Sequence, residues 1–434
     1  MRFFLLSAVA GVAGMACAAA PSVSNVTVTP SDDGHTVTIA YALTDGPAIV
    51  TLDVLTNGVS VGAALERVSG DANRYVDADS GTIVWRPDFP FGSFSASGEV
   101  VAKVTAWTID DTPNYLVVDL HSTSSQRLRY FEREDLLPGG LFSNPEYRTS
   151  AMVFRRVPAT GVTVTLGEKE GVPGRQTDKS EDLHQVSFSH DWYAAVFETT
   201  QSQWAMVYGT SVSGKCTIGG GYRPMETCAY TTIRDKGVEA NYYPADPNDN
   251  SFLGLFRKLT KGEPGFPQGV DFDLPGECQW EYTCRGIYGS GYYNDGGKVT
   301  QWQKDDKIPG RYQFNQAETN AWTDAEAGTK GPESATAIVG SYAPNAWGIY
   351  DMHGNVWEWC NDWYQADITS LNGVVNASGK FLADGVTVGS TRVRRGGSWY
   401  NVASDMLPSR RLNRDPSQLN SQIGFRVFCR AGLK

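Results

Sequence analysis

Residues 21–110 alternate apolar and polar positions with a period of two. The segments "HTVTIAYAL", "AIVTLDVLTNG" and "GTIVWRP" place Val, Ile and Thr at alternate positions, and Asp-Gly and Asn-Gly pairs separate the runs. Such alternation is typical of strands with one buried face, and Asn-Gly or Asp-Gly is typical of hairpin turns. This pattern predicts a β-sandwich of the immunoglobulin or fibronectin type, with Trp85 in its core.

The pattern changes twice further along the chain. Residues 111–147 are mixed, polar and interrupted by Pro and Gly; "NYLVVDL" could add one strand, and we otherwise expect a linker. From residue 148 to 434 short strand-like runs, such as "MVFRRVPATGVTVTLGE" and "HQVSFSHDWYAAVFETT", precede three short helical patterns. We expect helices at 199–209, capped by Thr199 or Thr200, at 251–261, and at 275–286, with Pro275 in the first turn. The fold class expected for this second, loop-rich domain is α+β.

The first twenty residues have the composition of a secretory signal peptide. Arg2 precedes an apolar run and then small residues, and the run is too short to span a membrane. Acylation of Cys17 is an alternative that would anchor the chain to a lipid surface. No later apolar stretch is long enough for a transmembrane helix, so we expect a secreted, periplasmic or cell-surface protein.

Charge and cysteine content narrow the classes of partner. The formal net charge is −11 and no Lys/Arg run occurs, so the chain lacks the electrostatic means to hold nucleic acid. Without Cys17 six cysteines remain, an even number that indicates disulfides in an oxidising compartment. Cys216 and Cys228 bracket a flexible loop and are expected to pair, whereas the connectivity of the others is open: Cys278, Cys284, Cys360 and Cys429. Zinc is not expected, because no C-x-x-C motif is present.

Four stretches carry a family resemblance: "VFETTQSQWAMVYG", "FDLPGECQWEYTCRG", "NAWGIYDMHGNVWEWCNDWY" and "RRGGSWYNVASDMLPSRRLNRDPSQLNSQIGFRVF". Together they resemble the sulfatase-modifying-factor family, whose founding activity is that of the formylglycine-generating enzyme. The resemblance implies a compact domain over residues 148–434, related to the C-type-lectin fold and often carrying calcium.

The residues themselves suit calcium. Asp351 and Glu358 offer hard carboxylates, and Gly354 and Val356 lie between them in a turn that can point carbonyl oxygens inward. The resemblance implies that these four positions are the ligands. A second family site would begin at Asn315 and Gln316, with its partner carboxylate open. The alternative is that Asp351 and Glu358 only cap turns beneath tryptophans.

The family's reactive cysteines are missing. In the formylglycine-generating enzyme two cysteines after the Gly-Gly-Ser motif bind copper(I) and oxidise a substrate cysteine with oxygen; the matching positions here hold Asn401 and Met406. Neither side chain can become the thiolate that this chemistry needs. We therefore expect no copper and no formylglycine-generating activity. Ser398 matches a pocket serine of the family, but no histidine follows His353 to activate it.

Binding is the function that remains best supported. The C-terminal loop offers aromatic, amide, hydroxyl and charged groups, a mixture typical of recognition surfaces. The candidate binding residues are Trp399, Tyr400, Asn401, Ser404, Asp405, Arg410 and Arg414. We expect a pseudoenzyme that binds an extracellular protein or glycan. Two alternatives stay open. The chain could be a family enzyme of protein or peptide maturation, formylglycine-generating-like or siderophore-maturation-like, with altered chemistry. The arginines of this region could instead pin the loop through buried ion pairs, the interpretation favoured for Arg426.

Overall fold

The computed structural model describes residues 19–88, 99–121, 127–209, 221–234, 246–264, 272–287, 293, 297–298, 300–301, 304–313, 335–375 and 389–430. The expected signal peptide lies almost entirely outside these ranges. Among the described residues, no helix combines the length and the apolar character needed to cross a bilayer.

The N-terminal part consists of two antiparallel sheets that share one apolar cluster. The first sheet has the order β1 (Ser22–Pro30), β2 (Val37–Thr44), β7 (Ser80–Trp85), β5 (Val68–Gly70). The second contains β4 (Val59–Ser60), β3 (Ala48–Thr56), β6 (Arg74–Val76) and β8 (Val100–Trp107). Alternate residues of β2 are buried, as the period-two pattern predicts. Trp85 lies in the core, 1% exposed.

A six-stranded antiparallel sheet forms the centre of the molecule. Its order is β10 (Leu128–Phe131), β9 (Tyr115–Asp119), β11 (Ala151–Val157), β14 (Trp192–Ala195), β21 (Phe428–Arg430), β15 (Phe272–Asp273). The expectation of a linker over 111–147 is therefore wrong, because β9 and β10 belong to this sheet. In β9, Leu116 and Val118 face one apolar cluster while Val117 faces another. A strand buried on both faces lacks the alternation that reveals a half-exposed strand.

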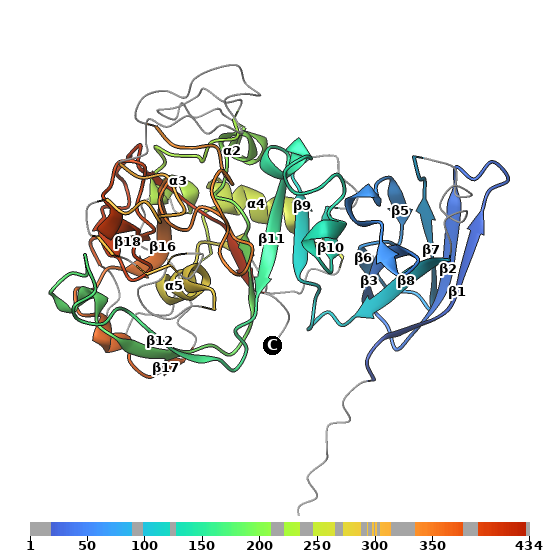
Figure 1. Cartoon of the computed structure of the whole chain (residues 1–434), viewed down its shortest axis with the longest axis horizontal. Helices are drawn as coiled ribbons and strands as arrows, with labels where there is room; N and C mark the ends of the chain where they lie inside the picture. The colour runs from blue at the N-terminus through green and yellow to red at the C-terminus, as the bar shows by residue number, and fades with distance from the viewer. Residues whose placement is uncertain are drawn as a thin grey trace, which may run out of the picture.

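Direct contacts join the N-terminal sheets to this central sheet. The Tyr130 amide donates to the Asn73 carbonyl at 2.7 Å, and Arg133 pairs with the buried Asp53 carboxylate at 3.2 Å. Figure 1 shows β9, β10 and β11 between the N-terminal strands and the remainder of the chain. The two parts are thus packed against one another through β10.

The helices occur where capping signals predict them. Thr200 and Gln203 form a capping box at the start of α2 (Gln201–Tyr208). Ser251 caps α4 (Phe252–Thr260), and α5 (Glu277–Arg285) starts after Gly276. Pro275 thus precedes the cap and does not lie in the first turn as expected. A fourth, short helix is α3 (Tyr230–Ile233).

A third four-stranded sheet carries the C-terminal loop. Its order is β19 (Arg411–Arg414), β18 (Arg392–Arg395), β16 (Trp357–Trp363), β20 (Ile423–Gly424), with β20 parallel to β16. A small sheet combines β12 (Thr163–Leu166), β13 (His184–Ser187) and β17 (Val374–Val375). The remaining short 3₁₀ turns are η1 (Gly62–Ala64), η2 (Glu134–Leu136), η3 (Pro145–Arg148), η4 (Lys179–Glu181), η6 (Ile368–Leu371) and η7 (Ala403–Met406). In Figure 1 the sheet that contains β16 and β18 lies at the end of the molecule away from β1–β8. The mixture of sheets and few short helices agrees with the α+β expectation.

The disulfide expectation is wrong for the cysteines that the structure describes. Cys228, Cys278, Cys284 and Cys360 are buried thiols without a bridge, and Cys216 lies outside the described ranges. Cys228 packs in the main apolar cluster and its Sγ approaches the Met225 carbonyl at 3.7 Å. These cysteines act as small core residues, a common role for buried thiols.

Candidate functional site

Two glycines open the loop that follows β18, and close packing requires both. Gly396 has a φ of 97° and Gly397 a φ of 77°, in the region that favours glycine. A Cβ on Gly397 would lie 2.4 Å from Met406 Cε, and one on Gly396 3.0 Å from the Trp280 ring. The Gly-Gly pair therefore lets the backbone turn closely over buried side chains.

The side chain of Asn401 is held at both ends of its amide group. Its Oδ1 accepts from Trp357 Nε1 at 2.8 Å and from Ser398 Oγ at 2.5 Å, while its Nδ2 donates to Asp405 Oδ2 at 2.8 Å. The Ser398 hydroxyl, which is fully buried, also approaches the Gln422 side chain at 3.5 Å. Asn401 thus connects β16 to the loop, and the partners of the Ser398 hydroxyl among the described residues are amide groups, none of which can act as a base.

Met406 is fully buried behind the same loop, and one histidine links it to a thiol. His353 Nδ1 lies 2.8 Å from the Met406 carbonyl oxygen, and His353 Nε2 lies 3.8 Å from Cys284 Sγ. Burial raises the pKa of the Cys284 thiol, so the thiolate is disfavoured at neutral pH. This cysteine does not replace the reactive thiols that Asn401 and Met406 lack.

The aromatic candidates for binding differ in their exposure. Tyr400 is 54% exposed, whereas Trp399 is 2% exposed and donates from Nε1 to the Ser421 carbonyl at 3.0 Å. Their rings meet edge to face, with centroids 5.4 Å apart. Ser404 is also buried. Trp399 and Ser404 therefore support the loop, and Tyr400 is presented to solvent on top of it.

The charged candidates divide in the same way. Arg410 pairs with Asp405 at 2.8 Å and with the buried Glu181 at 3.0 Å, so it ties the loop to η4. Asp405 is already engaged by Arg410 and Asn401. Arg414 belongs to β19 and makes no such ion pair in the described part of the chain. The interpretation that arginines pin the loop holds for Arg410.

Buried ion pairs also fasten the loop to α5. Arg411 donates through Nη2 to Glu277 Oε2 at 2.9 Å, and Arg395 Nη2 lies 3.0 Å from both Glu277 and Glu281. All four side chains are almost fully buried. Such paired, hydrogen-bonded charges specify geometry more than they add stability. They fix the position of the loop relative to α5.

The predicted metal turn has the backbone conformation that a tight turn demands. Asp351, Gly354 and Asn355 have φ values of 59°, 104° and 64°. Asp351 Oδ2 accepts from the Gly340 amide at 2.6 Å, whereas Asp351 Oδ1 is buried and has no hydrogen-bond partner among the residues that the structure describes. A buried carboxylate oxygen without a partner is unusual and marks a place for a missing cation or proton.

Glu358, the second predicted carboxylate ligand, is already paired. Arg426 Nη2 lies 2.8 Å from Glu358 Oε1, and Trp280 Nε1 donates to Glu358 Oε2 at 2.7 Å. Arg426 also donates to the carbonyl oxygens of Ala195 and Val196 at 2.9 and 3.0 Å. The expectation of a buried ion pair for Arg426 is confirmed.

A third carboxyl group, Glu198, belongs to this turn and was missed from the sequence. Its Oε1 accepts from the Val356 amide at 3.1 Å and its Oε2 from Asn355 Nδ2 at 2.5 Å. Burial, together with Asp351 and Glu358, raises the pKa of Glu198 well above its ordinary value. Nothing in "VFETT" signals this role, because the two segments are far apart in the sequence.

The carboxyl groups around this turn outnumber the positively charged groups. Three buried carboxyl groups, Glu198, Asp351 and Glu358, face one guanidinium, Arg426, and burial raises the pKa of Asp351 to about 6. Within the described ranges no three His, Cys, Asp or Glu side chains are arranged to hold a metal. Calcium, which accepts backbone carbonyls, fits the unpartnered Asp351 oxygen better than a metal that needs side-chain ligands only. Asn315 and Gln316, the expected start of a second site, lie outside the described residues.

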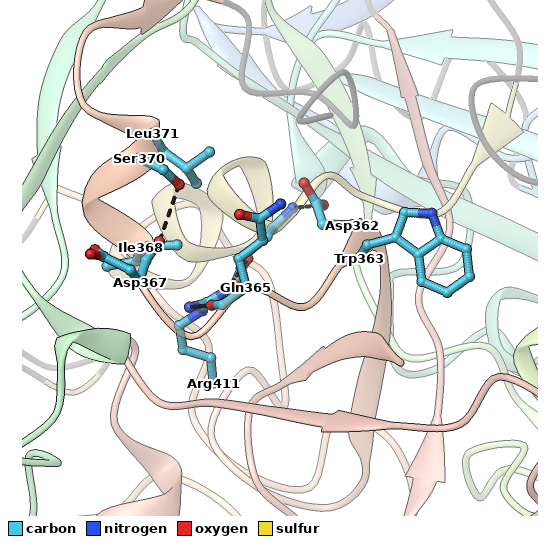
Figure 2. A pocket seen from close by; sticks show the side chains of 9 residues that line it. Asp362, Trp363, Gln365, Asp367, Ile368, Ser370, Leu371 and Arg411 are labelled. Atoms are coloured by element: carbon cyan, nitrogen blue, oxygen red, sulfur yellow. Dashed lines mark hydrogen bonds and ion pairs between the residues drawn. The ribbon is translucent and has the colours of Figure 1, made fainter. Parts of the chain in front are cut away.

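A separate small hollow lies at the start of α5. Its lining residues are Glu277, Asp362, Trp363, Gln365, Asp367, Ile368, Ser370, Leu371 and Arg411. Figure 2 shows the Asp362 carboxyl group and Arg411 at this hollow. Asp362 Oδ2 accepts from the Glu277 amide at 2.6 Å, while Asp362 Oδ1 has no hydrogen-bond partner within the described ranges. Burial and the neighbouring Glu277 raise the pKa of Asp362 to about 7.

Comparison with known proteins identifies relatives of the C-terminal domain. The formylglycine-generating enzyme of Streptomyces coelicolor is 32% identical over 171 residues, which cover 37% of this chain and 47% of the enzyme. The serine/threonine-protein kinase pkn1 of Chlamydia caviae is 32% identical over 174 residues, covering 40% of this chain and 23% of the kinase. The chain thus spans less than half the length of either curated relative.

Among solved structures, PvdO from Pseudomonas aeruginosa covers 64% of this chain at 22% identity, with 94% of its own length aligned and a TM-score of 0.44. Treponema denticola variable protein 1 covers 64% of this chain at 23% identity, with 95% of its length aligned and a TM-score of 0.43. The sequence model of the sulfatase-modifying factor enzyme 1-like domain matches residues 148–431. The chain therefore belongs to the sulfatase-modifying factor enzyme 1-like domain family.

Proposed function

We propose that this chain is an extracytoplasmic binding protein of its family, which recognises a protein or glycan through the Tyr400–Asp415 loop and does not make formylglycine. The observation that carries the proposal is the state of Asn401 and Met406. Both ends of the Asn401 amide are hydrogen-bonded and Met406 is fully buried. The positions that the family enzyme fills with two thiols therefore serve to hold the loop.

The reaction that this chain is proposed to lack is the copper-dependent oxidation of a substrate cysteine. Oxidation of a substrate cysteine on copper(I) needs two soft thiolate ligands, one of which can exchange with the substrate thiol. A carboxamide cannot do this, and a thioether cannot lose a proton. Cys284 lies behind His353, buried and with a raised pKa, and does not reach the loop surface.

The exposed part of the loop supports recognition of a ligand. Within the loop Tyr400 is 54% exposed and Asn413 is exposed as well, and just after the loop Gln418 and Leu419 are also exposed. Tyr400 stands on Trp399, which is itself buried and hydrogen-bonded. A rigidly held tyrosine contributes contact area without a large loss of conformational entropy on binding.

Calcium is part of the same proposal, as a structural ion. Asp351 would hold it with the carbonyl oxygens of Gly354 and Val356, and its charge would offset the buried carboxylates of this turn. Glu358, the other expected ligand, is committed to Arg426 and Trp280 and would stay outside the coordination shell. The unpartnered Asp351 oxygen supports this. Titration calorimetry with Ca²⁺ should show binding, and a chelator should lower the melting temperature. Absence of both effects would remove calcium from the proposal.

The absence of formylglycine formation is tested directly. The purified protein is incubated with copper and a peptide containing Cys-x-Pro-x-Arg, and the peptide mass is followed. We expect the mass to stay unchanged. Conversion of the cysteine CH₂SH group to an aldehyde would overturn the proposal.

Binding is tested on glycan and peptide arrays with a matched pair of variants. Tyr400→Ala removes the exposed ring, whereas Val59→Ala truncates a side chain that is 69% exposed in the N-terminal sheets. Ligands of the loop should lose signal with the first variant and keep it with the second. Signals that respond equally to both variants would place the binding surface elsewhere.

A further inference from the structure

Three arginines share one face of the sheet formed by β18 and β19. Arg392 lies directly opposite Arg414, and Arg394 lies opposite Leu412. Because side chains alternate along a strand, Arg392, Arg394 and Arg414 point to the same side. Like charges that face each other across strands repel, so this arrangement needs a compensating partner.

Arg392 has partners within the protein. Its guanidinium carbon lies 3.5 Å from the centroid of the Trp363 ring and 4.7 Å from that of Tyr230. Its Nη1 donates to the Asn361 carbonyl. Aromatic faces and a carbonyl therefore compensate this charge.

Arg394 and Arg414 are different. In the part of the chain that the structure describes, neither side chain has an ion pair or a hydrogen bond, and the Nε atoms of both are buried without an acceptor. Both residues are half-buried, so each has lost part of its hydration. Guanidinium groups with unsatisfied buried donors are costly unless an acceptor arrives.

The electrostatic surroundings agree with an unbalanced pair. Burial, followed by the charge of Arg414, lowers the pKa of Arg394 to about 10, and Asp405 opposes this shift. The Asp405 carboxylate, however, already accepts from Arg410 and Asn401. Asp415 interacts electrostatically with the neighbouring Arg414, but its Oδ1 accepts from Ser417, so within the described residues neither Arg394 nor Arg414 forms an ion pair with a carboxylate.

The pair is also held in place beside the binding loop. The Arg394 guanidinium lies 4.8 Å from the centroid of the Trp357 ring, and Trp357 Nε1 donates to Asn401 Oδ1. Arg394 is therefore packed on the tryptophan that fastens the loop next to Tyr400. A guanidinium held this way loses little conformational freedom when it donates two hydrogen bonds to an oxyanion.

From these contacts we propose that Arg394 and Arg414 form an oxyanion site, which receives one carboxylate, sulfate or phosphate group of a ligand. Arginine forks match the paired oxygens of these groups and form charge-assisted hydrogen bonds with them. The inference rests on the proposed binding function and adds a charge requirement to the ligand. Because the whole chain has a net charge of −11, its surface as a whole repels anions. Binding of an anion would therefore depend on these two arginines.

The test uses the full chain and three small anions, so it does not depend on knowing the ligand. Melting temperature is followed while sulfate, phosphate or acetate replaces chloride at constant ionic strength, up to about 10 mM, since a ligand that binds only the native state raises the melting temperature. Calorimetry on the unmodified protein measures the same binding directly. We expect a saturable rise for at least one anion, and the order of affinity identifies the chemical class.

Four arginine variants, one of them a control, test whether the anion binds at Arg394 and Arg414. Arg394→Gln and Arg414→Gln should each abolish the rise. Without anion, each variant should melt no lower than the unmodified protein, because it removes one of two charges that repel each other. Arg67→Gln is the matched control, because Arg67 is an exposed residue of the N-terminal part that pairs with exposed Asp88; it should keep the full rise. Arg394→Lys retains the charge without the fork and should weaken binding without abolishing it.

Failure of the oxyanion site can be distinguished from failure of the proposed binding function. If the unmodified protein shows no saturable response to any of the three anions, the oxyanion site is wrong, whatever the arrays show. A response that survives in both glutamine variants would equally overturn it. Anion binding at these arginines without any array ligand would instead retain the site and reject the protein or glycan partner.

Discussion

Asp362 should make the stability of the C-terminal domain fall as pH rises through the acidic range. Its pKa is raised to about 7 from an ordinary value of 3.8, chiefly by burial. The unfolded chain loses this proton near pH 4, while the folded chain keeps it until about pH 7. Protonation thus stabilises the fold, and this contribution is fully present below pH 4 and lost as pH approaches 7.

The magnitude follows from the size of the shift. A difference of about 3 pKa units, at about 1.4 kcal/mol per unit, corresponds to about 4 kcal/mol. Asp362→Asn should remove this dependence, because an amide oxygen can still accept from the Glu277 amide. Its NH₂ group takes the place of the protonated oxygen at the hollow. The variant should match the wild type at pH 4 and exceed its free energy of unfolding by up to about 4 kcal/mol at pH 8.

The assay is urea unfolding followed by tryptophan fluorescence at pH 4, 6 and 8. Only Trp85 and Trp107 of the twelve tryptophans precede residue 148, so the signal reports mainly on the C-terminal domain. Asp306→Asn is the control, since that carboxylate is 82% exposed. The reasoning is refuted if Asp362→Asn keeps the wild-type change in stability between pH 4 and pH 8.

Three further predictions concern the loop and its support. Arg426→Met should destabilise the domain by about 3–5 kcal/mol in chemical unfolding, because it leaves the buried Glu358 without its partner; a loss below about 1 kcal/mol would contradict this account. Gly397→Ala should lower stability by about 1–3 kcal/mol, since the φ of 77° and the contact with Met406 both oppose a Cβ, and an unchanged melting temperature would argue against the described turn. Tyr400→Ala should leave the unfolding free energy within about 0.5 kcal/mol of the wild type, because the ring is exposed; a larger loss in the same assay would show that the ring has a structural role.

Local patterns accounted for much of the secondary structure. The alternation in β2 and the Thr200–Gln203 capping box involve neighbours in the sequence, and their effects act over one strand or one turn. Strand β9 was only a possible addition to a linker, because both of its faces are buried and burial on both faces leaves no period to read. The disulfide expectation failed because an even cysteine count says nothing about the distance between sulfurs.

The sequence by itself determined which reactive groups the C-terminal loop contains: Asn401 and Met406 cannot supply thiolates wherever the fold places them. Only the tertiary structure decided which charges are paired. Arg410 and Arg426 pair with buried carboxylates, whereas Arg394 and Arg414 form no ion pair in the described part of the chain. Chemical identity belongs to a single residue, but ion pairing and desolvation depend on distances between segments that are remote in the chain.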